Sequence, residues 1–158
     1  MRLQGKCAIV TGAGSGFGEG IALRFAAEGA RVMVADINMD GAGRVASACG
    51  GIACRVDVAD GASVEAMVSA AMAEMGQVDI LVNNAGINRQ GPIDTVTEED
   101  WDEIMAVNLK GPFLVSQEVL PLMVEAGGGR IINIASAAGQ IGFPLRSPYA
   151  ASKWAVIG

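Results

Sequence analysis

The stretch Cys7-Ala8-Ile9-Val10-Thr11-Gly12-Ala13-Gly14-Ser15-Gly16-Phe17-Gly18 joins a short apolar run to a glycine-rich loop, after which a helical pattern begins. Glycine lets the backbone turn sharply and lets a pyrophosphate approach the main chain, while the helix that follows points its free N–H groups at the phosphates. The spacing is Gly12-x-x-x-Gly16-x-Gly18, since Phe17 stands where a G-x-G-x-x-G pattern has its third glycine. A flexible surface loop is the alternative, but a position between a strand and a helix favours phosphate binding.

Short apolar runs alternate with longer helical patterns along the rest of the chain. Runs this short, rich in Val and Ile and without polar alternation, fit strands that are buried on both faces. The predicted strands are Cys7–Val10, Arg31–Ala35, Ile52–Val56, Asp79–Val82 and Arg130–Ala135. The predicted helices are Gly16–Glu28, Asp40–Ala48, Asp60–Met75, one that opens at Thr97 and breaks near Asn108–Pro112, and one from Pro112 to about Ala126. This alternation predicts βαβ units, a parallel sheet and right-handed crossovers.

The composition excludes several classes of protein. The chain has 158 residues, of which 51% are hydrophobic and 22 are glycines, and this suits one domain with a buried sheet and Ala-rich helices. The net charge is −6 and there is no basic cluster, so we expect neither nucleic acid nor an anionic membrane as a partner. No apolar run approaches the ~18 residues of a membrane span, and no signal peptide is evident, so we expect a cytoplasmic protein.

The chain contains no histidine, which excludes Ser-His-Asp and Cys-His catalysis and argues against a catalytic metal site. The cysteines Cys7, Cys49 and Cys54 are odd in number and lack CxxC spacing, so we expect reduced thiols. Proton chemistry must therefore come from Tyr, Lys, Asp, Glu or Cys. Tyr149, the one tyrosine, and Lys153 lie at i and i+4 and share a helix face, where the ammonium would stabilise a phenolate. Alone, such a pair is most often an ordinary surface pair.

Two acidic residues follow predicted strands. Asp36 can accept hydrogen bonds from both hydroxyls of an adenosine ribose and would repel a 2′-phosphate, which favours NAD over NADP. The alternative role of Asp36 is a turn or a helix cap. Asp57 is placed to reach an adenine edge, although an aspartate after a strand is also a common turn former.

Taken together, these residues resemble the short-chain dehydrogenase/reductase family. The matching motifs follow one another in the family's order and are Thr11 to Gly18, Asp36, Asp57-Val58, Asn83-Asn84-Ala85-Gly86, Asn108, Ser136 and Tyr149-Ala150-Ala151-Ser152-Lys153. The resemblance covers the whole chain and implies hydride transfer between NAD(H) and a secondary alcohol or ketone without a metal. It implies catalytic roles for Asn108, Ser136, Tyr149 and Lys153. It implies that the cofactor is bound by Gly12, Ser15, Gly16, Phe17, Gly18, Asp36, Asp57, Val58, Asn84, Ala85, Gly86, Tyr149 and Lys153.

The resemblance also assigns a role to each catalytic residue. Tyr149 would exchange a proton with the substrate oxygen, and Ser136 would donate a hydrogen bond to the same atom. Lys153 would stabilise the phenolate and bind the nicotinamide ribose, while Asn108 would hold a water that links Lys153 to solvent. Asn83 is expected to be mainly structural. The residues expected to rim the substrate pocket are Asn88, Arg89, Gln90, Gln140, Phe143 and Arg146.

Members of the family continue beyond the position of Gly158. We therefore expect residues 1–158 to form a single dinucleotide-binding domain that is incomplete at its C-terminus, an α/β doubly wound parallel sheet of Rossmann type. Its five strands would lie in the order 3-2-1-4-5, with Arg130–Ala135 as an exposed edge. Tyr149 and Lys153 would sit on a helix of barely two turns. The full-length form is expected to be a homo-oligomer.

Three functional readings remain. The first is an NAD-dependent dehydrogenase or reductase, with a 3-oxoacyl thioester or a sugar or polyol as substrate. The second is a nucleotide-binding module with little or no turnover. The third is a methyltransferase, which also pairs a glycine-rich loop with an acid after the second strand but does not require Tyr149 and Lys153.

Overall fold

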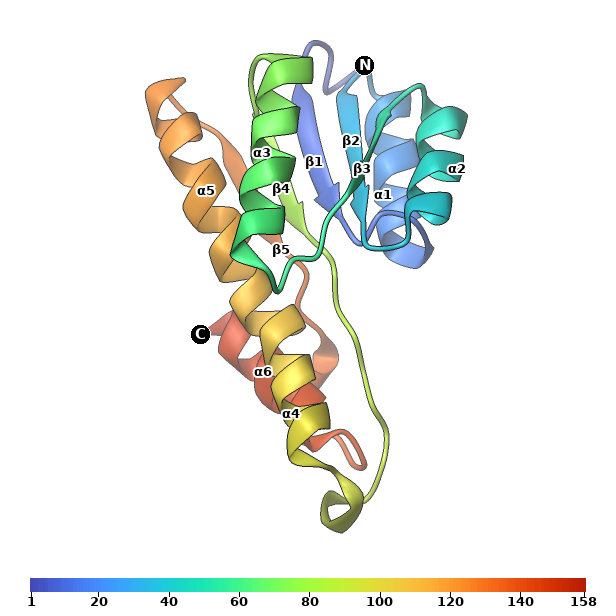
Figure 1. Cartoon of the computed structure of the whole chain (residues 1–158), viewed down its shortest axis with the longest axis vertical. Helices are drawn as coiled ribbons and strands as arrows, with labels where there is room; N and C mark the ends of the chain where they lie inside the picture. Colours follow the sequence, from blue (N-terminus) through green and yellow to red (C-terminus); the bar gives the residue numbers. More distant parts are fainter.

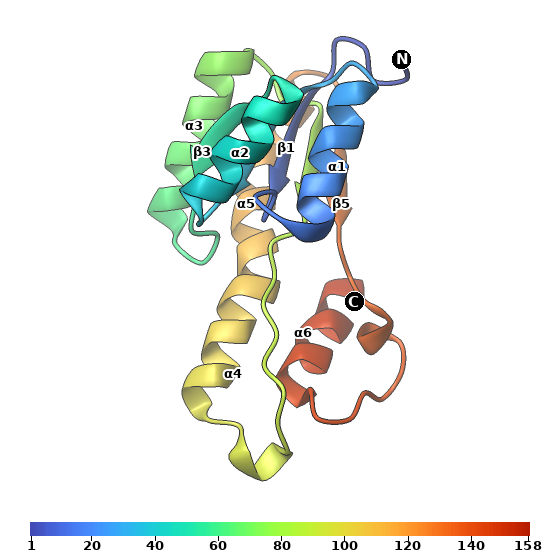
Figure 2. The ribbon, with the colours of Figure 1, turned by 90° about the vertical axis from the view of Figure 1, so that its right-hand side faces the viewer.

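The computed structural model describes residues 1–158 and contains one parallel five-stranded sheet with helices on both faces (Figures 1 and 2). The strands are β1 (Cys7–Thr11), β2 (Arg31–Asp36), β3 (Ile52–Arg55), β4 (Ile80–Asn83) and β5 (Arg130–Asn133). Their order is β3-β2-β1-β4-β5, and every neighbouring pair is parallel. The predicted α/β class, Rossmann-type winding and strand order are confirmed.

The helices form the outer layers of the molecule. They are α1 (Gly16–Ala27), α2 (Met39–Cys49), α3 (Gly61–Met75), α4 (Glu98–Met105), α5 (Gly111–Glu125) and α6 (Ser147–Ile157). Shorter elements are the 3-10 helices η1 (Ile93–Thr95) and η3 (Ala137–Gly139) and the π-helix η2 (Ala106–Lys110). The predicted N-caps are present, because Asp60 accepts from the Ala62 N–H and Thr97 accepts from the Asp100 N–H. All the helices fall short of the length and apolar character that a membrane crossing demands.

Two apolar cores lie on opposite faces of the sheet, as the two-residue period of a strand requires. Ile9, Met33 and Leu81 face α3 and α5, where they pack with Val64 and Val115 among others. The alternate strand residues face α1 and α2. These are Ala8, Val10, Val32, Val34 and Val82, and they pack with Ala22, Ala42 and Val45. Each large side chain that is fully buried in this way stabilises the fold by about 1.5–3 kcal/mol.

Three predictions of where elements end are wrong by more than one residue. The chain does not break near Asn108–Pro112, because η2 joins α4 to α5 without interruption (Figure 1). Gly111 N–H donates to the Ala106 carbonyl, and this wider turn accommodates the ring of Pro112 and its missing N–H. The strand predicted to end at Ala135 ends at Asn133. The helix that carries Tyr149 and Lys153 has 11 residues rather than barely two turns.

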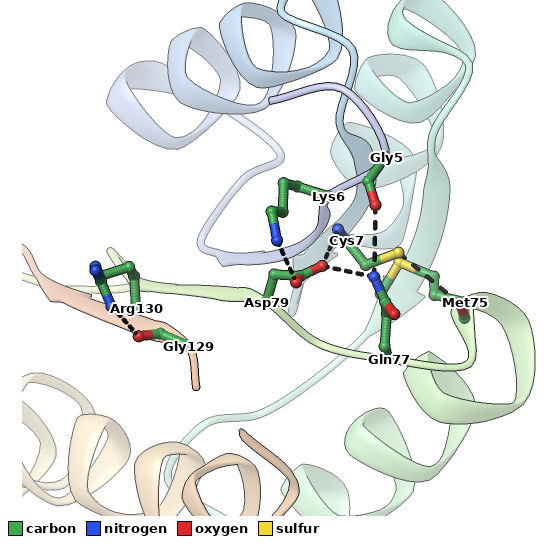
Figure 3. Close-up of polar contacts among 8 residues, drawn as sticks. All are labelled: Gly5, Lys6, Cys7, Met75, Gln77, Asp79, Gly129 and Arg130. Carbon is green, nitrogen blue, oxygen red and sulfur yellow. Dashed lines mark hydrogen bonds and ion pairs between the residues drawn. The ribbon is translucent and has the colours of Figure 1, made fainter. Parts of the chain in front are cut away.

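A polar cluster ties together the chain segments at the amino ends of β1 and β4 (Figure 3). The Asp79 carboxylate accepts from Lys6 Nζ at 2.9 Å, from the Cys7 N–H at 2.8 Å and from Gln77 Nε2 at 2.9 Å. Burial raises the pKa of Asp79, but the hydrogen bonds from Cys7, Lys6 and Gln77 outweigh it, so the pKa lies below its usual value. This cluster fixes the sheet at the edge opposite to the glycine loop.

The segments that follow β4 and β5 extend beyond the carboxyl edge of the sheet. There, α4, α6 and the loop after β4 form a lower part of the molecule, and the N-terminus lies at the far end (Figures 1 and 2). Parallel sheets of this kind bind ligands at the carboxyl ends of their strands. The glycine loop after β1 opens at this same edge.

Candidate active and cofactor site

A cleft of about 520 Å³ opens at the carboxyl edge of the sheet. Its lining residues are Gly12, Ser15, Gly16, Phe17, Asp36, Ile37, Val56, Asp57, Val58, Asn84, Ala85, Gly86, Ile87, Glu103 and Val107. Ten of the thirteen predicted cofactor residues therefore line one cavity. Gly18, Tyr149 and Lys153 do not line it, whereas Ile37, Val56, Ile87, Glu103 and Val107 line it and were not predicted.

Two glycines of the loop are required by close packing. Gly12 has φ +62°, and a Cβ there would lie 2.7 Å from the Cα of Ala85. A Cβ on Gly18 would collide with the Gly12 carbonyl and with the side chain of Asn84, at 2.6 Å from its nitrogen. Gly18 is buried beneath the loop. In this structure, the absence of a side chain at Gly18 lets α1 pack against Gly12.

Thr11 and Asn84 fasten the glycine loop to the end of β4. Asn84 Nδ2 donates to the carbonyl oxygens of Thr11 at 2.9 Å and Gly12 at 3.0 Å. In return, Thr11 Oγ1 accepts from the N–H groups of Asn84 and Ala85, each at 3.1 Å. The Asn84 amide nitrogen is thus occupied within the protein, although Asn84 also lines the cleft. Thr11 was quoted in the motif without a role, and its place directly before Gly12 was the available signal.

The Asp36 carboxylate is held at the rim of the cleft by the backbone. Oδ2 accepts from the Gly14 N–H at 2.8 Å, and Oδ1 accepts from the Asn38 N–H at 2.9 Å. Each oxygen keeps a second lone pair that can accept another hydrogen bond. Asp57 also lines the cleft, and its Oδ1 accepts from the Ala59 N–H at 3.0 Å, as a turn former does. Its contact with an adenine edge stays a prediction. No three His, Cys, Asp or Glu side chains lie close enough together to hold a metal ion.

Lys153 lies near both Gly86 of the cleft and the ring of Tyr149. Its side chain is buried, with the residue only 5% exposed, and its Nζ donates to the Ile134 carbonyl at 2.7 Å. Nζ lies 5.8 Å from the centre of the Tyr149 ring and 3.8 Å from the place that a Cβ on Gly86 would take. Burial lowers the pKa of Lys153. Since an ammonium has three donors, two remain for other partners.

Asn108 connects the loop after β4 to α6. Its Oδ1 accepts from the Ile87 N–H at 2.8 Å, and its Nδ2 donates to the Ile87 carbonyl at 2.9 Å and to Ser152 Oγ at 3.1 Å. Ser152 Oγ in turn donates to the Tyr149 carbonyl at 2.8 Å. Asn108 is 1% exposed, and η2 presents it to this junction. Ser152 was missed as a site residue, although it lies inside the quoted Tyr149 to Lys153 motif.

Ser136 follows β5 and precedes η3. Its Oγ accepts from the Ala138 N–H at 3.2 Å, as an N-cap does. Gly139 at the end of η3 approaches α6 so closely that a Cβ there would lie 2.6 Å from the Lys153 carbonyl. Ser136 therefore belongs to a segment that packs directly on the helix of Tyr149 and Lys153.

Four of the six residues predicted to rim the substrate pocket have side-chain partners that place them in two separate groups. The Arg146 guanidinium lies 5.1 Å from the centre of the Phe143 ring, and its Nε lies 2.9 Å from the Gln90 amide, whose oxygen accepts from it when the amide is turned to face Arg146. Arg89 instead pairs with Asp100 and with Glu103, the latter at 2.7 Å. The structure brings Gln90 and Phe143 together around Arg146, which is the N-cap residue of α6.

A parallel sheet with a glycine loop after β1 and a carboxylate at the end of β2 defines a Rossmann-type nucleotide-binding domain. A family model described as "short chain dehydrogenase" matches residues 6–158. The chain belongs to the short-chain dehydrogenase family.

Relatives and solved structures agree with this assignment. The chain is 46% identical to D-threitol dehydrogenase of Mycolicibacterium smegmatis, and the match covers 99% of this chain and 62% of the relative. It is 41% identical to 3-oxoacyl-[acyl-carrier-protein] reductase FabG of Thermotoga maritima, with coverage of 100% and 66%. A structure of 3-ketoacyl-(acyl-carrier-protein) reductase from Brucella melitensis complexed with NADH superimposes with a TM-score of 0.95 at 40% identity, covering 98% of this chain and 67% of that one. The chain thus spans less than two thirds of the length of some of these relatives.

Proposed function

We propose that the protein is an oxidoreductase that transfers a hydride between NAD(H) and a secondary alcohol or ketone, with Tyr149 as general acid and base. The observation that carries this proposal is the position of Lys153. Its Nζ lies at the Gly86 end of the cleft and beside the Tyr149 ring, and two of its donors are free. A cofactor that lies along the cleft from Asp36 to Gly86 would therefore end next to the phenol.

Lys153 and the residues around it each have a role in the proposed proton transfer and in cofactor binding. The nicotinamide supplies or accepts the hydride when it is bound. In the reduction direction, Tyr149 gives its hydroxyl proton to the carbonyl oxygen of the substrate, and Ser136 donates a hydrogen bond to that oxygen. Lys153 stabilises the phenolate that remains and binds the nicotinamide ribose through its free donors. By the resemblance to the family, Asn108 would hold a water through which Lys153 regains a proton from solvent.

The preference for NAD over NADP follows from Asp36. Its two oxygens each keep a lone pair for a ribose hydroxyl, and its negative charge repels a 2′-phosphate. The relative from Brucella melitensis whose structure contains NADH supports the choice of cofactor. The named relatives support two substrate classes, namely polyols and 3-oxoacyl thioesters.

Self-association is part of the proposal. Phe113, Leu120 and Val124 are 61%, 52% and 69% exposed, and the seven- and four-residue spacings between them place them along one side of α5. An exposed apolar stripe of this kind favours contact with a second copy of the protein.

The test is NADH oxidation by the protein and by Tyr149→Phe, over a panel of keto sugars and 3-oxoacyl thioesters. We expect at least one substrate to turn over, and we expect Tyr149→Phe to lower kcat by about 100-fold or more, because positioned proton transfer contributes 10²–10⁴-fold. NADH affinity should change little, since a phenyl ring preserves the packing. Equal turnover by the two proteins would exclude Tyr149 as the acid. Binding of S-adenosylmethionine in place of NADH would favour the methyltransferase.

A further inference from the structure

We infer that Arg44 of α2 is a positioning residue for the cofactor, which acts by holding the Gly14 peptide that orients the Asp36 carboxylate. The inference rests on the proposed NAD site and identifies what sets its selectivity. Neither Arg44 nor its partner Glu19 lines the cleft, so both act through the loop.

A continuous chain of hydrogen bonds runs from α1 to β2. The two terminal nitrogens of Arg44 each donate to one oxygen of Glu19 at 2.7 Å. Nη2 of Arg44 also donates to the Gly14 carbonyl at 3.1 Å. The Gly14 N–H then donates to Asp36 Oδ2 at 2.8 Å. Gly14 is therefore held on both sides, by a guanidinium at its carbonyl and by the selectivity-determining carboxylate at its N–H.

The close approach of α2 to the loop makes this arrangement possible. A Cβ on Gly14 would lie 2.9 Å from Asp36 Oδ2, and a Cβ on Gly41 would lie 2.9 Å from the Gly14 carbonyl. Gly41 and Arg44 are three residues apart and share a face of α2, so Arg44 reaches the loop where Gly41 lets the helix contact it. Neither glycine needs a left-handed φ. Both are explained by contact with the Gly14 peptide or with Asp36.

The geometry distinguishes Arg44 from an ordinary surface pair. Its side chain is 58% exposed, and an exposed ion pair by itself contributes little to stability. The pair with Glu19 is bidentate, however, and a third hydrogen bond goes to the loop itself, which fixes orientation as well as charge. The hydrogen bond from Arg44 also lowers the pKa of Glu19, so the acceptor stays ionised at neutral pH.

Release of Gly14 should affect the two cofactors differently. If the peptide can rotate, Asp36 loses one of the two backbone donors that orient it. NAD then loses well-placed acceptors for its ribose hydroxyls. The 2′-phosphate of NADP meets a carboxylate that can turn away, so its exclusion weakens. The ratio of the NADH and NADPH affinities should therefore change, while the stability of the fold should change little.

The experiment measures the dissociation constants of NADH and NADPH, from nucleotide fluorescence, for the intact protein and four variants. Arg44→Ala removes all three hydrogen bonds. Arg44→Lys keeps the positive charge but lacks the paired guanidinium donors. The exchanged pair Glu19→Arg with Arg44→Glu restores opposite charges between α1 and α2 but removes the donor at position 44. Arg24→Ala is the matched control, because Arg24 pairs with Glu28 at the C-cap of α1 and makes no hydrogen bond to the glycine loop.

We expect Arg44→Ala to reduce the preference for NADH over NADPH about 10-fold, the effect of losing one charge-assisted hydrogen bond. Arg44→Lys and the exchanged pair should also show reduced preference, while Arg24→Ala should stay within about 2-fold. An unchanged preference in Arg44→Ala would overturn the inference and leave the NAD site standing. A full preference for NADH in the exchanged pair would also overturn the inference, because an ion pair between α1 and α2 would then be enough to maintain that preference. If the intact protein bound neither nucleotide, the proposed function and the inference would fail together.

Discussion

Replacing Asn108 with alanine should loosen the junction on which the placement of Tyr149 depends. The Asn108 side chain makes two hydrogen bonds to the backbone of Ile87 and one to Ser152 Oγ. Asn108→Ala removes all three and leaves both backbone groups of Ile87 without their partner. Because Ser152 is bonded to the Tyr149 carbonyl, the change reaches the catalytic helix directly.

The magnitude follows from the number of groups left unpaired. An unsatisfied buried polar group costs about 1–3 kcal/mol, and Ile87 is half-buried, so water can compensate in part and the lower value applies. Three lost hydrogen bonds at about 1 kcal/mol each give a destabilisation of about 3 kcal/mol. For a domain of this size, this lowers Tm by about 6–12 °C.

The assay is thermal and urea unfolding, with two comparison variants. Ser152→Ala removes one of the three bonds and also the bond from Ser152 Oγ to the Tyr149 carbonyl, so it should cost about 2 kcal/mol. Asn88→Ala removes an exposed amide from the same loop and should stay within about 0.5 kcal/mol of the parent. If Asn108→Ala and Asn88→Ala unfolded at the same urea concentration, the hydrogen-bonded junction would not be what holds α6 in place.

The remaining predictions concern charge. Asp79 has a lowered pKa, so its stabilisation is complete above the usual carboxyl pKa of about 3.9 and is lost as the pH falls through the folded value. The urea midpoint of the parent should therefore fall between pH 7 and pH 3 more steeply than that of Asp79→Asn. An equally steep fall in the two proteins would contradict this. Lys153 has a pKa lowered by burial, so the parent should gain stability as pH rises towards about 10.4, whereas Lys153→Met should lack this gain and should lose turnover. An equal rise of stability with alkaline pH in the parent and in Lys153→Met would contradict this prediction. Asp36→Ala should weaken NADH binding about 10-fold and narrow the gap to NADPH, and an unchanged ratio of the two dissociation constants would exclude the ribose contact.

The sheet was predictable because each strand is a short apolar run between turn residues. Ile9 and its neighbours carry that signal without reference to any other part of the chain. The π-turn of η2 was not predictable in this way, because Pro112 indicates a break unless the helix can widen by one residue, which depends on packing. Both the prediction and the structure nevertheless place Asn108 at this irregularity.

The cleft shows a similar division. The cofactor residues were predicted partly from their positions after strands and partly from the resemblance to the family, and ten of them line one cavity. Residues that act through a distant partner were missed, since no local pattern gives the contact from Thr11 to Asn84 or from Arg44 to Gly14. In the sequence, only Gly14 and Gly41 could have indicated the contact between α2 and the glycine loop. The close packing of α2 on the loop explains why both positions lack a side chain.

A crystal structure of the protein with NADH would examine the proposed site most directly. We expect the adenosine ribose at the Asp36 carboxylate and the nicotinamide ribose at Lys153 Nζ. The nicotinamide C4 should then face the Tyr149 hydroxyl across the space left for a substrate. A dinucleotide that lay in the opposite direction, or a Tyr149 hydroxyl turned away from C4, would contradict the proposed oxidoreductase chemistry.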